Sequence, residues 1–410
     1  MPEITRDRCT ISPDNLSKYG FAVFHHLGEA DPSSDVWQRD IVINIGLKQG
    51  NRIQTFSIPK KMLIQLPVAK KIVTADNFEI SRMSSALETI KLLSERAGWN
   101  QTEGDLKAML SMSTQGTFIS SYRHLGQKIS LGSGISLPVS DKLSWIGMIL
   151  VHPELRRQGI ASAIMEICLN HARLDQQASI IGLDATPQGK KVYDSLGFKD
   201  SFSVWRSIIP TNCTDEKIST DVEAITETSL IDEYLKTLDY TERLKITHQL
   251  CKLPGSECIL AKSGEKVCGF VLSRPGRIRP FVGPLIADTK EIAHDLLCSI
   301  LNQWNAKGHS HIFMDIPSYH LNNSIFYTEE KTTLSKNLQI PVQPSREFIR
   351  MYQLMTEQER IKDHATDEFS RSRKAMEKSV LNYEETLNFM QKEKHDLLPF
   401  MYGTGGPEWS

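Results

Sequence analysis

The chain has few cysteines, and they are not arranged as a disulfide or zinc framework. Seven cysteines are scattered over 410 residues, and no two of them form a C-x-x-C pair. An odd, scattered set argues against the disulfide scaffold of small secreted domains, and the missing pairs argue against a zinc knuckle. We therefore expect no metal site, cysteines that serve as small buried hydrophobes, and a reducing, cytoplasmic location.

Long apolar runs and an excess of charge of one sign are also lacking. No run approaches the roughly 18 apolar residues of a membrane span, and the first ten residues lack the apolar core of a secretory signal. Lys and Arg number 48 against 49 Asp and Glu, which gives a formal net charge of -1. This balance provides no general attraction to nucleic acid or to an anionic membrane, so we expect neither as a partner.

The composition that remains is that of an ordinary globular protein, with 40% hydrophobic and 24% charged residues. A length of 410 residues suits two or three domains. Residues 1–70 are expected to form a β-rich extension of unknown function. Within it, residues 40–47 and 52–58 alternate well enough to predict two strands joined by a hairpin.

Two runs of alternating strands and helices follow, and they define two repeats of one mixed α/β unit. The first repeat spans 71–210 and the second spans 218–410, with a polar, turn-rich linker between them near 209–217. A charged helical insertion is expected near 356–396. Apolar side chains recur over 376–390 at helical spacing, which predicts packing on its own domain, with a homo-oligomer contact as the alternative.

A βαβ crossover is predicted in the first repeat. The nearly continuous apolar run 144–151 is typical of a strand buried on both faces, and an amphipathic helix follows it. Residues 179–185 form the next strand, so the two strands should be parallel. A short helix comes next, with Thr186 as its cap, Pro187 in its first turn and Gly197 at its end.

The junction between that first strand and its helix concentrates positive charge and a glycine. Residues 156–161 read RRQGIA. A helix start has unpaired N–H groups and the positive end of the peptide dipole, and glycine lets a ligand approach the backbone closely. Arginines add donors suited to phosphate oxygens. The segment therefore predicts an anion cradle, with a solvated basic turn as the alternative, whereas the P-loop and Rossmann patterns lack their glycines.

These residues carry a resemblance to a known family. LRRQGIA after a buried strand resembles the R/Q-x-x-G-x-G/A motif of the GNAT superfamily, the acyl-CoA-dependent N-acetyltransferases. SIIGLDA and the helix with VYDSLGF resemble the next motif of that superfamily. AGWNQTEGDL and LDATPQGKKVYDSLGF look more like two-domain members, in which a degenerate second GNAT-like domain follows the catalytic one. The resemblance implies an α/β GNAT fold in tandem.

The resemblance also implies acetyl-CoA as the cofactor. Backbone N–H groups at the helix start would bind the pyrophosphate, and the strand before them would pair with the pantetheine arm. An N–H near Ile149 would face the thioester carbonyl as an oxyanion donor. The implied cofactor-binding residues are Met148, Ile149, Leu150, Val151, Arg156, Arg157, Gln158, Gly159, Ile160 and Ala161.

Tyr193 is the candidate catalytic acid. The ordinary pKa of a tyrosine, about 10, lies above the roughly 8.5 of a thiol, so the tyrosine is protonated and can donate to a leaving thiolate. A core tyrosine is the alternative. Asp184 is the candidate base, directly or through water, with capping of the Pro187 helix as the alternative. A desolvated amine would need no dedicated base.

Trp99 and Asn100 are the candidate substrate-binding residues. They follow the first helix of the first repeat, which borders the acceptor site in the GNAT fold. The alternative is a core tryptophan, with Asn100 capping the next helix. The second repeat lacks the cradle, and Asp288 and Glu291 at its corresponding helix start would repel phosphate. We expect this repeat to act as a scaffold and as one wall of the acceptor pocket.

The leading hypothesis is an acetyl-CoA-dependent N-acetyltransferase that acts on a primary amine of a small-molecule or amino-acid-like acceptor. One alternative is a protein lysine or N-terminal acetyltransferase. The lack of a carboxylate on the strand 144–151 argues against it, because lysine-directed relatives often place a glutamate there. The other alternative is a non-catalytic acyl-CoA-binding scaffold, which would keep the cradle without a functional Tyr193.

Overall fold

The structure is a computed structural model that describes most of the chain between residues 70 and 354 and shorter segments outside it. The described residues are 9–10, 22–29, 41–49, 52–59, 70–75, 78–82, 86–113, 115–124, 127–153, 156, 160–212, 220–225, 228–238, 243–321, 325–327, 340–354 and 401–403.

These residues fall into two compact units. The first unit takes residues 1–137 and 148–171, and the second takes 138–147 and 172–410. Strand β9 (Leu143–Val151) contributes its first half to the second unit and its second half to the first. The predicted domain boundaries divide the chain by sequence repeat, which is a different division from these compact units. They stay predictions.

A small antiparallel sheet forms from the N-terminal extension. Its strands are β1 (Cys9–Thr10), β2 (Ala22–Glu29), β3 (Ile41–Gln49) and β4 (Arg52–Pro59), in that order. β3 and β4 pair from Val42–Pro59 to Gln49–Arg52, which confirms the predicted hairpin.

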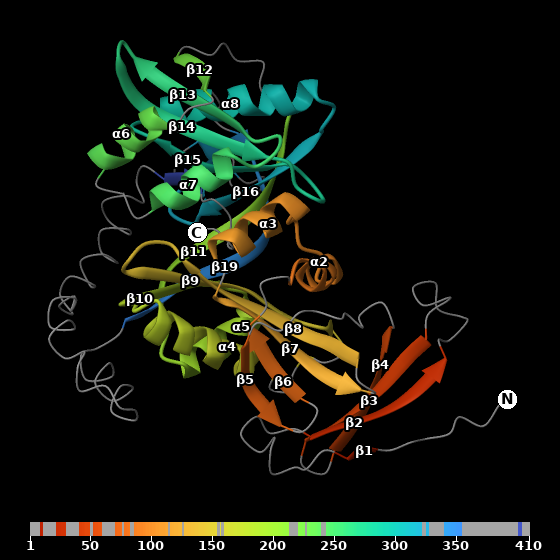
Figure 1. Cartoon of the computed structure of the whole chain (residues 1–410). Helices are drawn as coiled ribbons and strands as arrows, with labels where there is room; N and C mark the ends of the chain where they lie inside the picture. The colour runs from red at the N-terminus through yellow and green to blue at the C-terminus, as the bar shows by residue number, and fades with distance from the viewer. Residues whose placement is uncertain are drawn as a thin grey trace, which may run out of the picture. The chain divides into compact units, whose positions relative to one another are not determined.

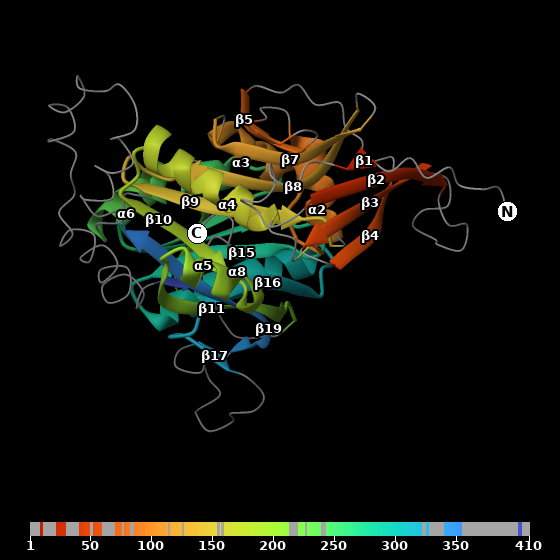
Figure 2. The ribbon, with the colours of Figure 1, turned by 90° about the horizontal axis from the view of Figure 1, so that it is seen from below.

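The rest of the first unit is an antiparallel sheet between two layers of helix. Its strands are β5 (Lys70–Ala75), β6 (Phe78–Arg82), β7 (Thr117–His124) and β8 (Gln127–Pro138), followed by the end of β9. Its helices are α2 (Leu87–Arg96), α3 (Glu103–Met112) and α4 (Ile160–Asn170), which continues as a short π-helical turn, η4 (His171–Asp175). Figure 1 and Figure 2 show α2 and α3 on one face of the sheet and α4 on the other.

The helix α4 packs closely on the sheet because two glycines of β8 face it. A Cβ at Gly134 would lie 2.4 Å from Cγ2 of Ile164, and one at Gly132 would lie 3.0 Å from Cδ1 of the same side chain. Ile160, Ile164 and Cys168 are buried on this face, as the apolar stripe predicted. The contact positions α4 directly beyond the end of β9.

The second unit is one long mixed sheet. Its strands run in the order β12 (Asp221–Ile225), β13 (Glu257–Ser263), β14 (Lys266–Arg274), β15 (Phe281–Ala287), β16 (His311–Pro317), β11 (Lys199–Pro210), β19 (Gln343–Leu354) and β10 (Ile180–Ala185), and β10 pairs with the start of β9. β10 and β9 are parallel, and so are β16 and β15, as expected for two βαβ crossovers.

The two repeats exchange their last strands in the middle of this sheet. β11 comes from the first repeat and pairs antiparallel with β16 of the second. β19 comes from the second repeat and pairs antiparallel with β10 of the first. β11 and β19 also pair with each other, so the exchanged strands lie side by side. Each repeat therefore completes its sheet with a strand of the other.

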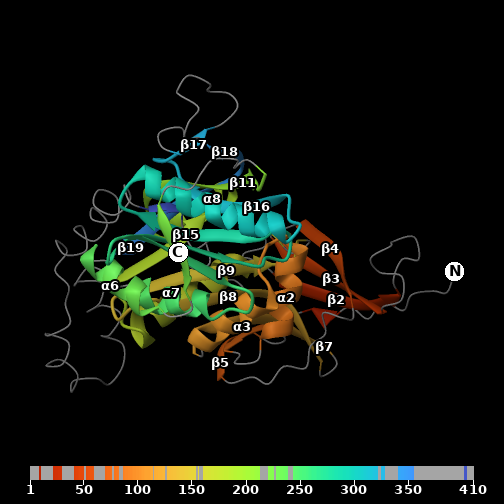
Figure 3. The same cartoon turned by 90° about the horizontal axis from the view of Figure 1, so that it is seen from above.

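Helices cover both faces of the β13–β16 part of the sheet. α8 (Lys290–Ala306) packs on one face, and α6 (Ser229–Thr237) and α7 (Leu244–Cys251) contact β14 from the other, as Figure 1 and Figure 3 show. α5 (Pro187–Ser195) lies against β10 and β19 (Figure 2). The short strands β17 (Phe326–Tyr327) and β18 (Ile340–Pro341) pair with each other.

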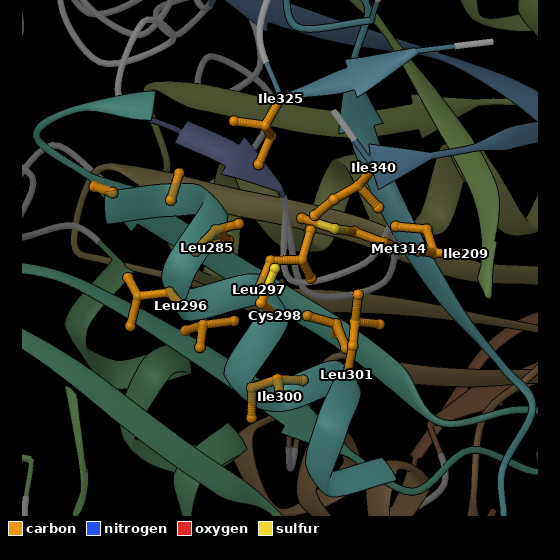
Figure 4. Close-up of a cluster of buried hydrophobic side chains, with 14 of the residues drawn as sticks. Ile209, Leu285, Leu296, Leu297, Cys298, Ile300, Leu301, Met314, Ile325 and Ile340 are labelled. Carbon is orange, nitrogen blue, oxygen red and sulfur yellow. The ribbon is translucent and has the colours of Figure 1, made fainter. Parts of the chain in front are cut away.

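The core of this part lies under α8. Leu296, Ile300 and Leu301 of the helix meet Leu285 of β15 and Met314 of β16, and all five side chains are completely buried (Figure 4).

Two parts of the sequence analysis differ from the structure or lie outside it. The predicted linker begins too early, because β11 runs to Pro210 and Thr211 is fully buried behind it. The polar, turn-forming residues at that point gave no sign that the strand continues. The helical insertion near 356–396 and its apolar stripe at 376–390 lie outside the described residues.

Candidate functional site

The parallel strands β9 and β10 separate after three paired residues. Leu143 pairs with Ile180, and the last pair joins Trp145 to Gly182. β10 continues to Ala185 with β19 on its other edge, and β9 continues to Val151. In the described part of the chain, no strand pairs with the edge of β9 that β10 leaves. A row of backbone N–H and C=O groups is therefore available along the end of β9.

Bulky side chains occupy the point where the strands separate. Trp145 is completely buried, and a Cβ at Gly182 would lie 2.3 Å from its ring. The ring of Tyr352 packs edge-on against Trp145, with centroids 6.1 Å apart. Gly182 is therefore required for the close approach of the indole.

Met148 interrupts β9 just beyond this point. Its φ of +53° lies in the left-handed region, which residues other than glycine seldom adopt. Its carbonyl accepts a hydrogen bond of 3.0 Å from the hydroxyl of Ser133. Such strain persists where the surroundings impose it, and it concentrates at functional sites. Of the predicted cofactor strand, Met148 and Leu150 are buried, and Ile149 and Val151 are half-buried.

The predicted anion cradle follows immediately. α4 begins at Ile160, which is buried, and Ala161 is half-buried in its first turn. Arg156 is exposed, and its Nε donates a long hydrogen bond of 3.4 Å to the carbonyl of Val151. Arg157, Gln158 and Gly159 lie outside the described residues. The structure thus places a strand end, an arginine and a helix start in succession, as the motif predicted.

His152 lies at the end of β9 and is 1% exposed. Its backbone N–H donates to the carbonyl of Leu131 at 3.0 Å, which fixes β9 to β8. Burial, together with the positive charges of Arg96 and Arg156, lowers the pKa of His152 to about 4. The imidazole is therefore neutral at physiological pH and adds no charge to the cradle.

Acid should destabilise the first unit through this histidine. The unfolded imidazole has a pKa near 6.5 and the folded one near 4, so the unfolded state binds the proton more readily. The contribution to stability is complete above pH 6.5 and is lost as the pH falls towards 4, a change of roughly 2–3 kcal/mol. We expect the free energy of unfolding, measured with urea, to change less between pH 7 and pH 4 in His152→Gln than in the wild type. The exposed control His311→Gln should show the same pH dependence as the wild type. Equal slopes for the wild type and His152→Gln would contradict this assignment.

The candidate base Asp184 is engaged in a buried ion pair. Nε and Nη2 of Arg350 donate to its two carboxylate oxygens, both at 3.0 Å, and each side chain is 1% exposed. Burial raises the pKa of Asp184, and the guanidinium of Arg350 opposes that shift. The capping alternative is wrong, because the hydroxyl of Thr186 accepts the hydrogen bond from the N–H of Gly189, at 3.2 Å.

The second repeat contains an equivalent ion pair that the sequence analysis did not find. Nε and Nη2 of Arg206 on β11 donate to Asp315 on β16, at 2.8 and 2.9 Å. Arg350 and Arg206 were both missed as partners. The available signal was an arginine within an apolar strand pattern, since a buried arginine needs a carboxylate.

The candidate acid Tyr193 lies in the last turn of α5 and is half-buried. Its ring lies over the first turn of the helix, where a Cβ at Gly189 would come within 3.0 Å of Cε2. The ring also packs edge-on against Phe198, with centroids 6.1 Å apart. The helix and the LGF turn after it, with Gly197 at a φ of +89°, hold the tyrosine as predicted.

Trp99 and Asn100 follow α2 and the left-handed Gly98, whose φ is +70°. The N–H of Trp99 donates to the carbonyl of Ser94 at 3.0 Å; the tryptophan is half-buried, and Asn100 is buried. Asn100 does not cap the next helix. That role belongs to Thr102, whose hydroxyl accepts from the N–H of Asp105.

The described residues contain neither a metal-binding cluster nor a membrane-spanning helix. No group of three His, Cys, Asp or Glu side chains among them is placed to hold a metal ion. Among the helices described, none combines the length and the apolar character that crossing a bilayer requires.

Comparisons with known proteins identify two related segments. Residues 112–205 match the family model of the acetyltransferase (GNAT) domain, and residues 240–342 match a second model of the same description. No curated protein matches the chain.

Solved structures are also similar to the chain, and three of them follow. A candidate acetyltransferase from Pyrococcus horikoshii is 17% identical, with a TM-score of 0.53, over 70% of this chain and 92% of that one. A GCN5-related N-acetyltransferase from Anabaena variabilis is 13% identical, with a TM-score of 0.44, over 68% and 72%. A tandem GNAT protein from the clavulanic acid biosynthesis pathway is 13% identical, with a TM-score of 0.46, over 68% and 98%.

Proposed function

The chain is a tandem GNAT protein with one acetyltransferase domain in each repeat, and from this premise we propose that it is an acetyl-CoA-dependent N-acetyltransferase for a small, amino-acid-like primary amine. Membership of the family supports acyl transfer as the class of reaction. We propose in addition the cofactor, the nitrogen acceptor and the residues that bind them.

The observation that carries the proposal is the available edge of β9, which ends directly at the start of α4. The amides of a pantetheine arm can pair with a strand edge as a peptide does, and Met148 to Val151 provide that edge. The N-terminus of α4, with Arg156 before it, provides N–H donors and positive potential for a pyrophosphate. The residues present therefore fit acetyl-CoA, which would supply the acetyl thioester.

The chain's own groups have three tasks in the reaction. The backbone N–H near Ile149 donates to the carbonyl oxygen where negative charge develops. Tyr193 gives its hydroxyl proton to the departing sulfur. The acceptor must be a neutral amine, and desolvation lowers the pKa of an amine without a dedicated base. This division leaves Asp184 as a positioning residue, because Arg350 holds both of its carboxylate oxygens.

Two guanidinium groups lie near the point where the strands separate. Those of Arg243 and Arg350 are both 5.2 Å from the ring centroid of Trp145. Guanidinium groups are donors suited to a carboxylate, so they favour an acceptor that carries a carboxylate next to the reacting amine, as an amino acid does.

The cradle is tested by Gly159. We expect Gly159→Val to weaken acetyl-CoA binding at least about tenfold in calorimetry, because a β-branched side chain would block the approach of the pyrophosphate to the backbone. Asn170→Val, at the exposed end of the same helix, is the matched control and should bind as the wild type does. Unchanged affinity in Gly159→Val would remove the cradle assignment.

The acceptor class is tested by thiol release. The purified chain is supplied with acetyl-CoA and a panel of amino acids, simple amines, polyamines and peptides. We expect turnover with amino acids and no turnover with the corresponding amines that lack the carboxylate. Turnover with peptides alone would indicate a protein acetyltransferase, and bound cofactor without turnover would indicate a scaffold. Either outcome would overturn the proposed acceptor.

A further inference from the structure

The second repeat contains the same separating pair of parallel strands as the first, and the buried ion pairs give the register. Asp184 on β10 and Asp315 on β16 are each held by an arginine of an exchanged strand. Two residues before Asp184, β10 pairs with Trp145 of β9. Two residues before Asp315, β16 pairs with Phe281 of β15. Trp145 and Phe281 are therefore equivalent positions.

β15 leaves β16 within one residue of the place where β9 leaves β10. The last pair joins Val282 to Met314, one residue beyond Phe281. The backbone then turns at Gly283, whose φ is +142°, much as Met148 interrupts β9. Both repeats thus contain a strand that loses its parallel partner and continues through an unusual backbone conformation.

In the second repeat, the edge that becomes available is occupied. The C-terminal strand β20 (Met401–Gly403) pairs antiparallel with β15, Met401 opposite Ile286 and Gly403 opposite Leu285. β14 pairs with the opposite edge of β15 at these same residues, so β20 lies on the edge that β16 leaves. β20 also contacts β16, which places it between the two separating strands.

The occupied residues correspond to the proposed cofactor strand. Counted from the equivalent aromatic residues, Leu285 and Ile286 match Ile149 and Leu150. We propose that the second GNAT domain is a peptide-binding domain whose ligand is the chain's own C-terminal strand, held where the first domain would hold the pantetheine arm. The comparison with a pantetheine arm rests on the proposed function; the peptide site itself stands on the strand pairing.

The chemistry of the site favours a peptide over a nucleotide cofactor. The backbone N–H and C=O groups of a strand edge can form hydrogen bonds with any extended chain of amides. A segment of the same polypeptide is present at high effective concentration. The helix that follows, α8, carries Asp288 and Glu291 beside its first turn, and its cap is Thr289. Negative side chains there oppose a pyrophosphate. The second domain therefore retains the strand-binding part of the site and lacks the phosphate-binding part.

Removal of the C-terminal segment tests this assignment. In a chain that ends at His395, the amides of residues 285–287 should exchange with deuterium at least about tenfold faster than in the full chain. A synthetic peptide of residues 396–410, labelled with a fluorophore, should bind the shortened chain saturably and restore the protection. A scrambled peptide should do neither. Unchanged exchange after removal, or no binding of the peptide, would overturn the proposal.

A point variant covers the case in which the shortened chain fails to fold. Gly403→Pro replaces a residue of β20 that pairs with β15 and should speed exchange at residues 285–287, whereas Gly405→Pro, beyond the strand, should not. Equal exchange in these two variants would contradict the peptide site.

Cofactor stoichiometry separates this proposal from the proposed function. We expect one CoA per chain in calorimetry, in both the full and the shortened protein. If the full chain bound a second CoA while the amides of β15 stayed protected from exchange, β20 would not occupy the place of a pantetheine arm. No CoA bound at all would refute the proposed function, and binding of the peptide would still decide the peptide site.

Discussion

Replacing Arg350 with methionine should lower the free energy of unfolding by roughly 3–5 kcal/mol, because the change leaves Asp184 buried without its counter-charge. The side chain of Asp184 is 1% exposed, and both of its carboxylate oxygens accept from the guanidinium. Burial raises the pKa of Asp184, and Arg350 opposes that shift, so loss of the arginine makes the charged form still less favourable. Urea unfolding followed by circular dichroism measures the loss.

Two companion variants separate the ion pair from its surroundings. The double variant Asp184→Leu with Arg350→Met should recover most of the stability, because two apolar side chains need no partner. Lys190→Met removes the surface ion pairs with Asp194 and Asp200 and should cost less than about 1 kcal/mol. A loss in Arg350→Met no greater than that of Lys190→Met would show that the buried pair is not needed.

Tyr193→Phe should reduce turnover by roughly two to three orders of magnitude and leave the affinity for acetyl-CoA unchanged. The substitution removes only the hydroxyl, and the edge-on contact with Phe198 and the packing over Gly189 are retained. The loss should therefore come from proton donation to the leaving sulfur. Steady-state thiol release gives the turnover, and calorimetry gives the affinity.

Tyr319→Phe is the matched control, because Tyr319 is 53% exposed and lies in the turn after β16. It should keep full activity. Full activity in Tyr193→Phe would remove Tyr193 as the acid, and an equal loss of turnover and affinity would indicate a binding role instead.

The elements of the fold were predictable where their apolar pattern is local. The run 144–151, the helix from Ile160 and the strand 179–185 are all present, and the pair of strands is parallel as the crossover requires. The exchange of β11 and β19 was not predictable. A strand shows which of its faces is buried, and nothing in its own residues names the strand beside it.

The candidate site shows the same limit. The motif RRQGIA pointed to a helix start after a strand, and α4 begins there. The partner of Asp184 lies 166 residues away in the chain, so its ion pair could not be inferred from spacing. The left-handed backbone of Met148 has no signal either, because glycine is the residue that normally marks this conformation.

The exchanged strands have a consequence for the order in which the protein can be made. β10 can find β19 only after the chain has grown by a further 166 residues, counted from Asp184 to Arg350. At about 5–20 residues per second, the ribosome needs roughly 10–30 s for that length. Throughout this interval one edge of β10 lacks its final neighbour, so a chaperone or a nascent-chain contact has time to bind it. A ribosome stalled before Gln343 should therefore carry a first domain whose central strand is still open to protease and deuterium.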